Sequence, residues 1–188
     1  MSSPDTALLV IDAQESFRRR PYWDDREATG FFIRLQALAD GAKAAGIPVV
    51  QCFHVEDTGV FSLAAGHVRT LAELSIVPDY VFNKRRHSAL VGTELGVWLT
   101  ERGISRLIVS GIRTEQCCET TTRHASDLGY TVDYVTEATL TFPMVDYNGR
   151  GWKTSEIRER TELVLDGRFA RIVSVKEALA PSRAAVAV

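Results

Sequence analysis

The sequence predicts a three-layer α/β/α fold in which helices cover both faces of a six-stranded parallel sheet. Short apolar runs of strand length alternate along the chain with segments whose apolar residues recur every three or four positions. This alternation is typical of parallel sheets covered by helices. The 188 residues fit one domain, since roughly 150 residues is a common domain size. We therefore expect a single domain over residues 1–188, with residues 181–188 as a frayed tail.

The predicted strands are short apolar runs, most of them rich in Val, Ile and Leu. Runs of this kind are typical of strands that are buried on both faces of a parallel sheet. They cover residues 7–11, 47–53, 80–82, 106–112, 130–135 and 169–175. Residues 54–78 and 139–152 carry no regular apolar pattern, so we expect them to be loops.

The predicted helices lie between these strands. Apolar residues from Phe31 to Ala42 are spaced by four, three and four positions, and Gly46 follows as a stop signal. Ser174 and Glu177 have the spacing of a capping box, which predicts a short final helix. The main helical patterns cover residues 31–42, 95–99, 118–128 and 157–165.

The composition argues against several classes of protein. Lysine and arginine number 22 against 24 aspartates and glutamates, so the basic excess typical of nucleic-acid binders is absent from the sequence. No apolar run approaches the ~18 residues of a membrane span, and no basic segment precedes the first apolar run as in a signal peptide. Cys52, Cys117 and Cys118 do not form a paired disulfide framework. We therefore expect a cytoplasmic protein without nucleic-acid or membrane partners.

Three strand ends carry side chains that can do chemistry. Asp12 follows the first strand, Lys84 follows the third, and Cys117 follows the fourth after a short turn. The carboxyl ends of parallel strands meet at one edge of the sheet, where ligands bind in such folds. Each residue alone has an ordinary structural explanation, such as a turn, a solvated lysine or a core thiol. Their combination predicts an active site.

The position of Cys117 favours a reactive thiol. Thr114 is a suitable N-cap for the following helix, which would put Cys117 in its first turn. There the unpaired N–H groups and the helix dipole favour the thiolate and lower its pKa. Cys118 lies about 100° further around the helix and joins its apolar face. We expect Cys117 to be the nucleophile, although the two roles exchange if the helix starts one residue later.

The base for this thiol is predicted to be a carboxylate. His124 lies seven residues beyond Cys117, roughly 10 Å along a helix, and cannot reach the sulfur. His54 ends the second strand and could enter the site, but no spacing requires a Cys–His pair. Asp12 is therefore the better base, and a nearby Lys84 would hold it ionised.

The chain resembles the isochorismatase-like cysteine hydrolases, a family that includes nicotinamidases and N-carbamoylsarcosine-type amidases. Residues 8–17 (LLVIDAQESF) are similar to its strand-Asp-x-Gln-x-x-Phe opening. Residues 84–95 (KRRHSALVGTEL) are similar to its Lys-x-x-x-Ser-Ala-Phe-x-x-Thr-x-Leu segment, with Leu90 in place of the aromatic residue. Residues 108–121 (IVSGIRTEQCCETT) resemble its most specific block, Gly-[Ile/Val]-x-Thr-x-x-Cys-Val-x-x-Thr. Residues 169–174 resemble its closing strand.

The resemblance implies Asp12, Lys84 and Cys117 as a catalytic triad. It also implies a cis peptide bond between Ile112 and Arg113, and an oxyanion hole formed by the backbone N–H groups of Arg113 and Cys117. The family fold is a six-stranded parallel sheet between helices, in agreement with the strand count above. The resemblance further implies a homo-oligomer, either a dimer or a tetramer.

Two departures from the family patterns narrow the expected chemistry. Metal-binding members carry an Asp-x-His pair, whereas residues 51–57 here read QCFHVED. Although His54 and His67 remain, a metal site needs more convergent ligands, so we expect no metal and no cofactor. Members that cleave isochorismate lack the cysteine. The presence of Cys117 therefore favours hydrolysis of a C–N bond in a small amide-type substrate.

Candidates for contacting the substrate come from the aromatic and polar residues near the predicted strand ends. Several aromatic side chains suggest a small, partly apolar or planar ligand, although many of them could simply pack the loops. Arg150, Lys153 or the arginines at 18–20 could hold a carboxylate. The proposed substrate-binding residues are Gln14, Phe17, Trp23, His54, Tyr147 and Trp152, and further aromatic candidates are Tyr22, Phe61 and Phe142.

Two other functions remain open from the sequence. The chain could hydrolyse an ether bond with Asp12 alone, leaving Cys117 a bystander, or it could be a binding protein on the same fold. Loss of a triad residue would favour the binding protein, and none is lost. Nucleotide binding is excluded, because the turn after the first strand has no glycine and no Walker sequence occurs.

Overall fold

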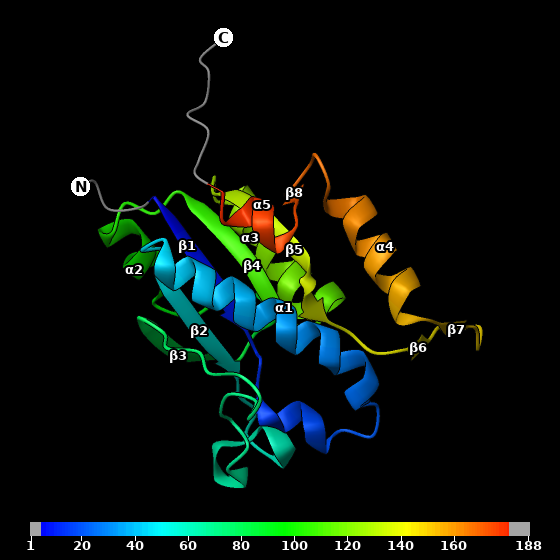
Figure 1. Cartoon of the computed structure of the whole chain (residues 1–188). Helices are drawn as coiled ribbons and strands as arrows, with labels where there is room; N and C mark the ends of the chain where they lie inside the picture. The colour runs from blue at the N-terminus through cyan, green and yellow to red at the C-terminus, as the bar shows by residue number, and fades with distance from the viewer. Residues whose placement is uncertain (1–4, 181–188) are drawn as a thin grey trace.

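The computed structural model describes residues 5–180, and the expected tail at 181–188 lies outside the described residues. It contains a six-stranded sheet in the order β3-β2-β1-β4-β5-β8, in which every neighbouring pair is parallel (Figure 1). The predicted fold class is thus confirmed. The six strands are β1 (Thr6–Ile11), β2 (Val49–His54), β3 (Tyr80–Lys84), β4 (Arg106–Ile112), β5 (Thr131–Leu140) and β8 (Arg171–Ile172).

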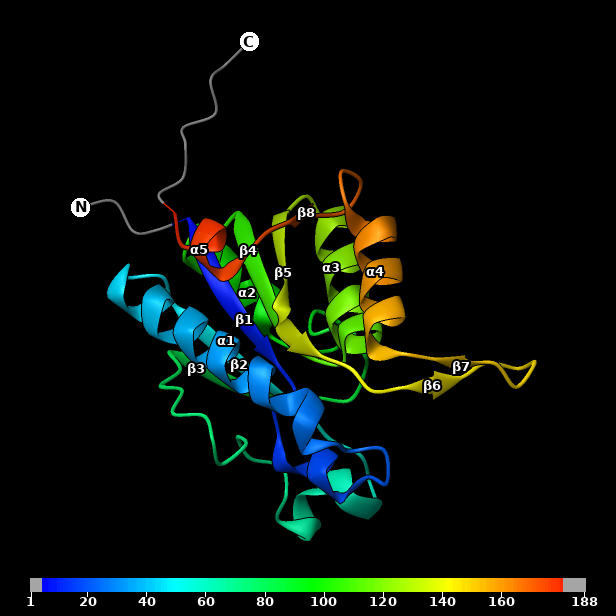
Figure 2. The same cartoon turned by 45° about the vertical axis from the view of Figure 1, so that its right-hand side comes forward.

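Helices cover both faces of this sheet. Residues of α1 and α5 belong to one buried cluster and residues of α2, α3 and α4 to the other, which gives the three layers seen in Figures 1 and 2. The helices are α1 (Asp25–Ala44), α2 (Leu95–Glu101), α3 (Glu119–Asp127), α4 (Thr154–Leu165) and α5 (Val175–Ala178). Three short 3-10 turns, η1 (Glu15–Arg19), η2 (Gly59–Phe61) and η3 (Leu63–Ala65), and one π-helical turn, η4 (Thr114–Cys118), complete the connections.

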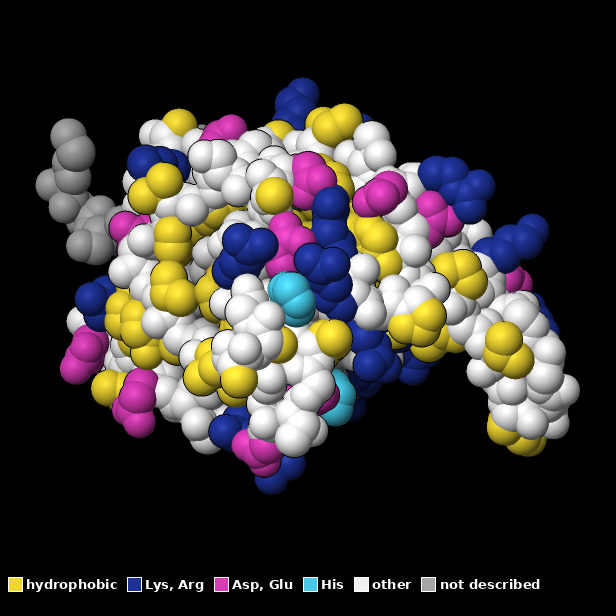
Figure 3. All heavy atoms as spheres, turned by 90° about the horizontal axis from the view of Figure 1, so that it is seen from below, with side chains coloured by type: hydrophobic (Ala, Val, Ile, Leu, Met, Phe, Trp, Pro, Cys, Tyr) yellow, Lys and Arg dark blue, Asp and Glu magenta, His cyan; other side chains and the backbone are white. Residues whose placement is uncertain are grey.

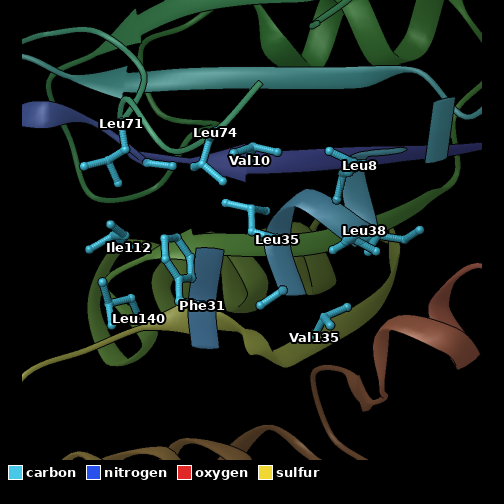
Figure 4. Close-up of a cluster of buried hydrophobic side chains, with 14 of the residues drawn as sticks. Leu8, Val10, Phe31, Leu35, Leu38, Leu71, Leu74, Ile112, Val135 and Leu140 are labelled. Carbon is cyan, nitrogen blue, oxygen red and sulfur yellow. The ribbon is translucent and has the colours of Figure 1, made fainter. Parts of the chain in front are cut away.

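Alternate side chains of β1 belong to the two buried hydrophobic clusters, one on each face of the sheet. Leu8 and Val10 face α1, whereas Leu9 and Ile11 belong to the cluster on the opposite face. Figure 4 shows Phe31, Leu35 and Leu38 of α1 pointing toward the sheet, as their spacing predicted. Each fully buried side chain of this size contributes roughly 1.5–3 kcal/mol to folding. These contacts hold α1 against β1, and they therefore hold in place the strand that Asp12 directly follows.

Gly111 allows β4 to approach β1 closely at the end that leads to the active site. Its φ is +121°, and a Cβ atom there would lie 1.9 Å from the carbonyl oxygen of Ile11. We expect Gly111→Ala to lower the free energy of unfolding by about 3 kcal/mol or more, because backbone strain and overpacking add. Denaturant titration measures this loss.

Gly96→Ala is the matched control for that substitution. Gly96 lies in α2, and no atom is within 4 Å of a Cβ added there. Because alanine favours a helix interior by up to about 1 kcal/mol over glycine, this variant should be at least as stable as the wild type. If Gly111→Ala had the same free energy of unfolding as Gly96→Ala, this would contradict the close approach of β4 to β1 at Gly111.

The structure corrects the two last strands of the prediction. β5 continues to Leu140 through an irregularity in its pairing with β4, although the prediction ended it at residue 135. β8 spans only Arg171–Ile172 instead of residues 169–175. The strand stops early because Ser174 caps α5, and its hydroxyl accepts a hydrogen bond from the Glu177 N–H.

The predicted loop at 139–152 contains a β-hairpin. Its strands β6 (Met144–Val145) and β7 (Gly151–Trp152) pair antiparallel, and the hairpin extends away from the rest of the molecule in Figures 1 and 2. Asp146 organises its turn: one carboxylate oxygen accepts from the N–H groups of Asn148 and Arg150, and the other from the Trp152 indole. Within residues 5–180, no helix is both long and apolar enough to span a bilayer.

Candidate active site

The carboxyl edge of the sheet brings together the three side chains predicted from the strand ends. Asp12 directly follows β1, Lys84 is the last residue of β3, and Cys117 lies in η4, just after β4. Figure 3 looks onto this edge from below and shows basic and histidine side chains among hydrophobic ones. The order β3-β2-β1-β4 places β1, and therefore Asp12, between the strands that supply the other two residues.

Asp12 and Lys84 form a fully buried ion pair. Lys84 Nζ donates to Asp12 Oδ2 over 2.8 Å, and both side chains are 0% exposed. Lys84 Nζ also donates to the carbonyl oxygen of Arg86 over 3.1 Å. Burial is the largest influence on Lys84 and would lower its pKa, but the charge of Asp12, its hydrogen bond and the nearby thiols of Cys52 and Cys117 together raise the pKa. The ammonium therefore stays charged throughout the physiological range.

The backbone of Asp12 turns sharply where β1 ends. Its φ of +50° lies in the left-handed region, which aspartate tolerates better than most residues. Its N–H still donates to the carbonyl oxygen of Cys52 on β2 over 2.9 Å. The backbone of Asp12 is thus held by the sheet, and its carboxylate is held by Lys84.

Cys117 is buried against this ion pair. Its side chain interacts with those of both Asp12 and Lys84, and the residue is 7% exposed. Burial raises the pKa of its thiol, the charge of Asp12 raises it further, and Lys84 only partly opposes them. The thiol is therefore protonated at neutral pH, and the carboxylate beside it is the group in place to accept its proton.

This arrangement corrects the expected activation of Cys117 by a helix N-terminus. Thr114 does not cap a helix, because its hydroxyl is hydrogen-bonded to that of Thr139 over 2.7 Å. Cys117 lies in the π-helical turn η4, and α3 begins only at Glu119. The predicted lowering of the pKa of Cys117 is wrong, since burial and the neighbouring carboxylate dominate.

The other two cysteines have different surroundings. Cys118 is 0% exposed and packs in the core cluster behind the sheet. Cys52 lies closer to the catalytic group: its thiol donates weakly to Asp12 Oδ1 over 4.0 Å, and burial, followed by Asp12, raises its pKa to about 12. The sequence analysis missed Cys52. The feature that could have identified Cys52 is its place on the second strand. In the parallel sheet Cys52 pairs with Ile11, the residue before Asp12.

Gln14 joins two strand ends and has little left with which to bind a substrate. It is fully buried, its Nε2 donates to Ser16 Oγ and to the carbonyl oxygen of His54, and its Oε1 accepts from the His54 N–H over 2.7 Å. Its predicted role in substrate binding stays a prediction, and in the structure its amide is engaged by the chain itself. Gln14 holds the end of β2 beside Asp12.

Phe17 and His54 both pack against Phe61, and His54 pairs with Lys84 in the register of β2 and β3. Phe61 packs edge-on against both, with ring centroids 5.0 Å from Phe17 and 5.9 Å from His54. His87, which the sequence analysis did not select, stacks against His54 at 6.3 Å. Burial, followed by the charge of Lys84, lowers the pKa of His54. The imidazole is thus neutral at pH 7 and offers hydrogen bonds without charge.

The remaining predicted substrate contacts lie elsewhere. Trp23 packs against Phe142 with ring centroids 5.4 Å apart, in a second aromatic group that also contains Tyr22. Tyr147 and Trp152 lie on the projecting hairpin, where Tyr147 is 96% exposed. The structure does not bring these last two residues to the site of the same chain.

The peptide bond between Ile112 and Arg113 is cis. The carbonyl oxygen of Arg113 accepts hydrogen bonds from the N–H groups of Gln116 and Cys118, each over 3.2 Å. Arg113 thus begins the turn that presents Cys117. Its N–H and that of Cys117 remain the predicted oxyanion donors. Across residues 5–180, no three His, Cys, Asp or Glu side chains gather in a way that would hold a metal ion.

Comparison with known proteins places these residues in a family. The model of the isochorismatase domain matches residues 6–155, which include Asp12, Lys84 and Cys117. The chain belongs to the isochorismatase family. The resemblance to the isochorismatase-like hydrolases inferred from the sequence segments is therefore confirmed.

Three known proteins are similar to half or more of the chain. The isochorismatase family protein YwoC of Bacillus subtilis is 41% identical over 152 residues, 73% of this chain and 78% of its own length. Streptothricin hydrolase of Streptomyces noursei is 30% identical over 72% of this chain and 50% of its own length. Nicotinamidase 3 of Arabidopsis thaliana is 35% identical over 51% of this chain and 43% of its own length.

Solved structures share the fold almost completely. The crystal structure of a Chromobacterium violaceum protein assigned to the isochorismatase family superposes with a TM-score of 0.85 and 27% identity, over 95% of this chain and 94% of its own. An isochorismatase-family structure from Burkholderia xenovorans gives 0.82 and 30%, over 95% of this chain and 87% of its own. The six-stranded α/β fold of this chain is thus that of its isochorismatase-family relatives.

Proposed function

We propose that the chain hydrolyses a C–N bond of a small amide-type molecule through a thioester on Cys117. The observation that carries this proposal is the position of the buried Cys117 side chain, in the turn that follows β4, beside the fully buried Asp12–Lys84 ion pair. A nucleophile of this kind needs a base within reach, and Asp12 is that base. Lys84 holds the carboxylate of Asp12 in place through the fully buried ion pair.

Each proton in the proposed reaction passes through Asp12. The carboxylate takes the proton of Cys117 as Sγ forms a bond to the carbonyl carbon. The tetrahedral oxyanion binds to the N–H groups of Arg113 and Cys117, and such donors each lower the barrier by about 3 kcal/mol in other hydrolases. Asp12 then protonates the departing nitrogen as the C–N bond breaks. It next deprotonates a water that attacks the thioester, and the thiol regains its proton as the acid leaves.

The names of two relatives support the choice of bond. One is a nicotinamidase and the other a streptothricin hydrolase. The surroundings of the site add a constraint on the substrate, since Phe17 and Phe61 are aromatic and His54 is neutral at pH 7. A small, uncharged and partly planar amide, lactam or ureide fits these aromatic and neutral side chains better than an anion does.

A substrate panel tests this proposal. Wild-type protein and Cys117→Ala are incubated with primary amides, ureides, carbamates and lactams, and release of ammonia or amine is measured. We expect release from at least one class by the wild type and none by the variant. A vinyl ether is included as a counter-substrate. Ether cleavage by both proteins, with no C–N cleavage, would contradict the proposal and favour an Asp12-only ether hydrolase.

A further inference from the structure

Arg113 lies at the junction of three segments that leave the carboxyl edge of the sheet. Its side chain is only 10% exposed, and its Nε lies 3.1 Å from Oε1 of Glu115, whose side chain is 9% exposed. Arg113 Nε and both Glu115 carboxylate oxygens have no hydrogen-bond partner within residues 5–180. The contact between the two buried side chains is therefore an ion pair and not a hydrogen bond, two to four residues before Cys117.

Two aromatic rings hold the other side of this guanidinium. Its Cζ lies 5.2 Å from the ring centroid of Tyr22 and 5.8 Å from that of Phe142. The two rings are themselves 5.0 Å apart, so the cation covers the seam between them. Arg113 Nη2 also donates to the carbonyl oxygen of Phe142 over 3.5 Å. Partly desolvated cation–π contacts of this kind stabilise by roughly 1–2 kcal/mol.

These contacts tie together parts of the chain that approach the site from different strands. Tyr22 follows β1 and η1, Phe142 follows β5, and Arg113 itself follows β4. The backbone of Arg113 begins the η4 turn, because its carbonyl oxygen accepts from the N–H groups of Gln116 and Cys118. A side chain anchored at several points therefore limits movement of its own peptide group.

We propose that Arg113 is a positioning residue whose buried side chain fixes its own backbone N–H as the oxyanion donor beside Cys117. The guanidinium is already engaged by Glu115, Tyr22 and Phe142. It is therefore not a ligand for a carboxylate on the substrate. This inference rests on the proposed function, because an oxyanion donor has a role only if Cys117 attacks a carbonyl.

Two reagents separate the position of this N–H from the reactivity of the thiol. p-Nitrophenyl acetate acylates Cys117 through a tetrahedral oxyanion, whereas iodoacetamide alkylates it by displacement and forms none. In Arg113→Met we expect acylation of Cys117 to slow at least tenfold and alkylation to slow less than threefold, with both adducts mapped by mass spectrometry. Arg113→Lys keeps a cation over the rings and should recover acylation to within about threefold of the wild type.

Two further variants complete the design. Glu115→Gln removes the ion pair with little change of shape and should slow acylation by a smaller factor than Arg113→Met does. Arg102→Met is the matched control, because the Arg102 guanidinium also covers an aromatic ring, that of Trp98 at 4.2 Å, but at the end of α2. It should leave both rates unchanged. Glu115→Gln also keeps the inference testable if Arg113→Met does not fold.

Four outcomes would overturn the inference. Arg113→Met could acylate like the wild type, or lose acylation and alkylation by the same factor, which would locate the effect at the thiol. With an amide substrate from the panel, a rise in KM at unchanged kcat would make Arg113 a substrate ligand. Wild-type protein that is not acylated at Cys117 would contradict the proposed function itself, and this inference with it.

Discussion

Replacing Cys117 with alanine is expected to reduce hydrolysis at least about a thousandfold. The side chain is the proposed nucleophile, and removing the nucleophile of a comparable catalytic group costs even more in well-studied enzymes. The residue is 7% exposed, and alanine leaves only a small gap, so the fold should persist. Turnover of the substrate found in the panel and the thermal unfolding midpoint are measured on the same sample.

The neighbouring cysteine provides the matched control. Cys118 is fully buried in the core behind the sheet, so Cys118→Ala should cost about 1 kcal/mol of stability and keep most of the turnover. The two variants remove the same atom from adjacent positions. Loss of activity in Cys118→Ala, with activity kept in Cys117→Ala, would show that the assignment of the nucleophile is wrong.

Replacing Asp12 with asparagine is expected to abolish turnover and yet make Cys117 easier to ionise. Asparagine cannot accept the thiol proton, so hydrolysis should fall at least about a thousandfold. The charge of Asp12 is the second cause, after burial, of the raised pKa of Cys117, whereas Lys84 lowers that pKa. Without the carboxylate charge, the thiol pKa falls. Alkylation of Cys117 by iodoacetamide at pH 8 should therefore be faster in the variant than in the wild type.

This test is specific because the same substitution should lower turnover and raise the rate of Cys117 alkylation. A variant that merely unfolded would label all three cysteines, whereas in folded Asp12→Asn labelling should accelerate at Cys117, and Cys52 and Cys118, at 2% and 0% exposed, should stay protected by burial. Peptide mapping across pH 6 to 10 gives the apparent pKa of the thiol in each protein. If turnover survived in Asp12→Asn, or if its Cys117 labelled more slowly, Asp12 would not be the base that controls this thiol.

The fold and the meeting of Asp12 with Lys84 could be predicted because both depend on local patterns. Each strand of the six-stranded sheet was visible as an apolar run, and a parallel sheet necessarily brings its carboxyl ends to one edge. Asp12 and Lys84 are 72 positions apart in the sequence, yet their side chains meet at 2.8 Å. Their position at strand ends was sufficient to predict that meeting.

The errors concern side chains whose partners lie far away in the sequence. Thr114 has the sequence context of an N-cap, but its hydroxyl is engaged by Thr139 on the part of β5 that was expected to be a loop. Gln14 was expected to face the substrate, and its partner is the backbone of His54, 40 positions away. Such contacts are set by packing between strands, which a pattern along one segment does not encode.

The Cys117 environment shows the same limit in energetic terms. From the sequence, the helix terminus was the main expected influence on the thiol, and it would lower the pKa. In the structure, burial and the charge of Asp12 determine the shift and raise it. The burial of a side chain depends on the whole fold, so the direction of the Cys117 pKa shift could not be predicted from its position near a helix end alone.

The acyl group itself provides the most direct test of the central claim. Wild-type protein is mixed with p-nitrophenyl acetate, quenched in acid within the first turnover, digested and analysed by tandem mass spectrometry, which separates Cys117 from Cys118 by fragmentation between them. The account predicts one acetyl group, on Cys117, that is absent from Cys117→Ala. An acetyl group on Cys52, Cys118 or Lys84 instead, or none on any residue, would contradict it.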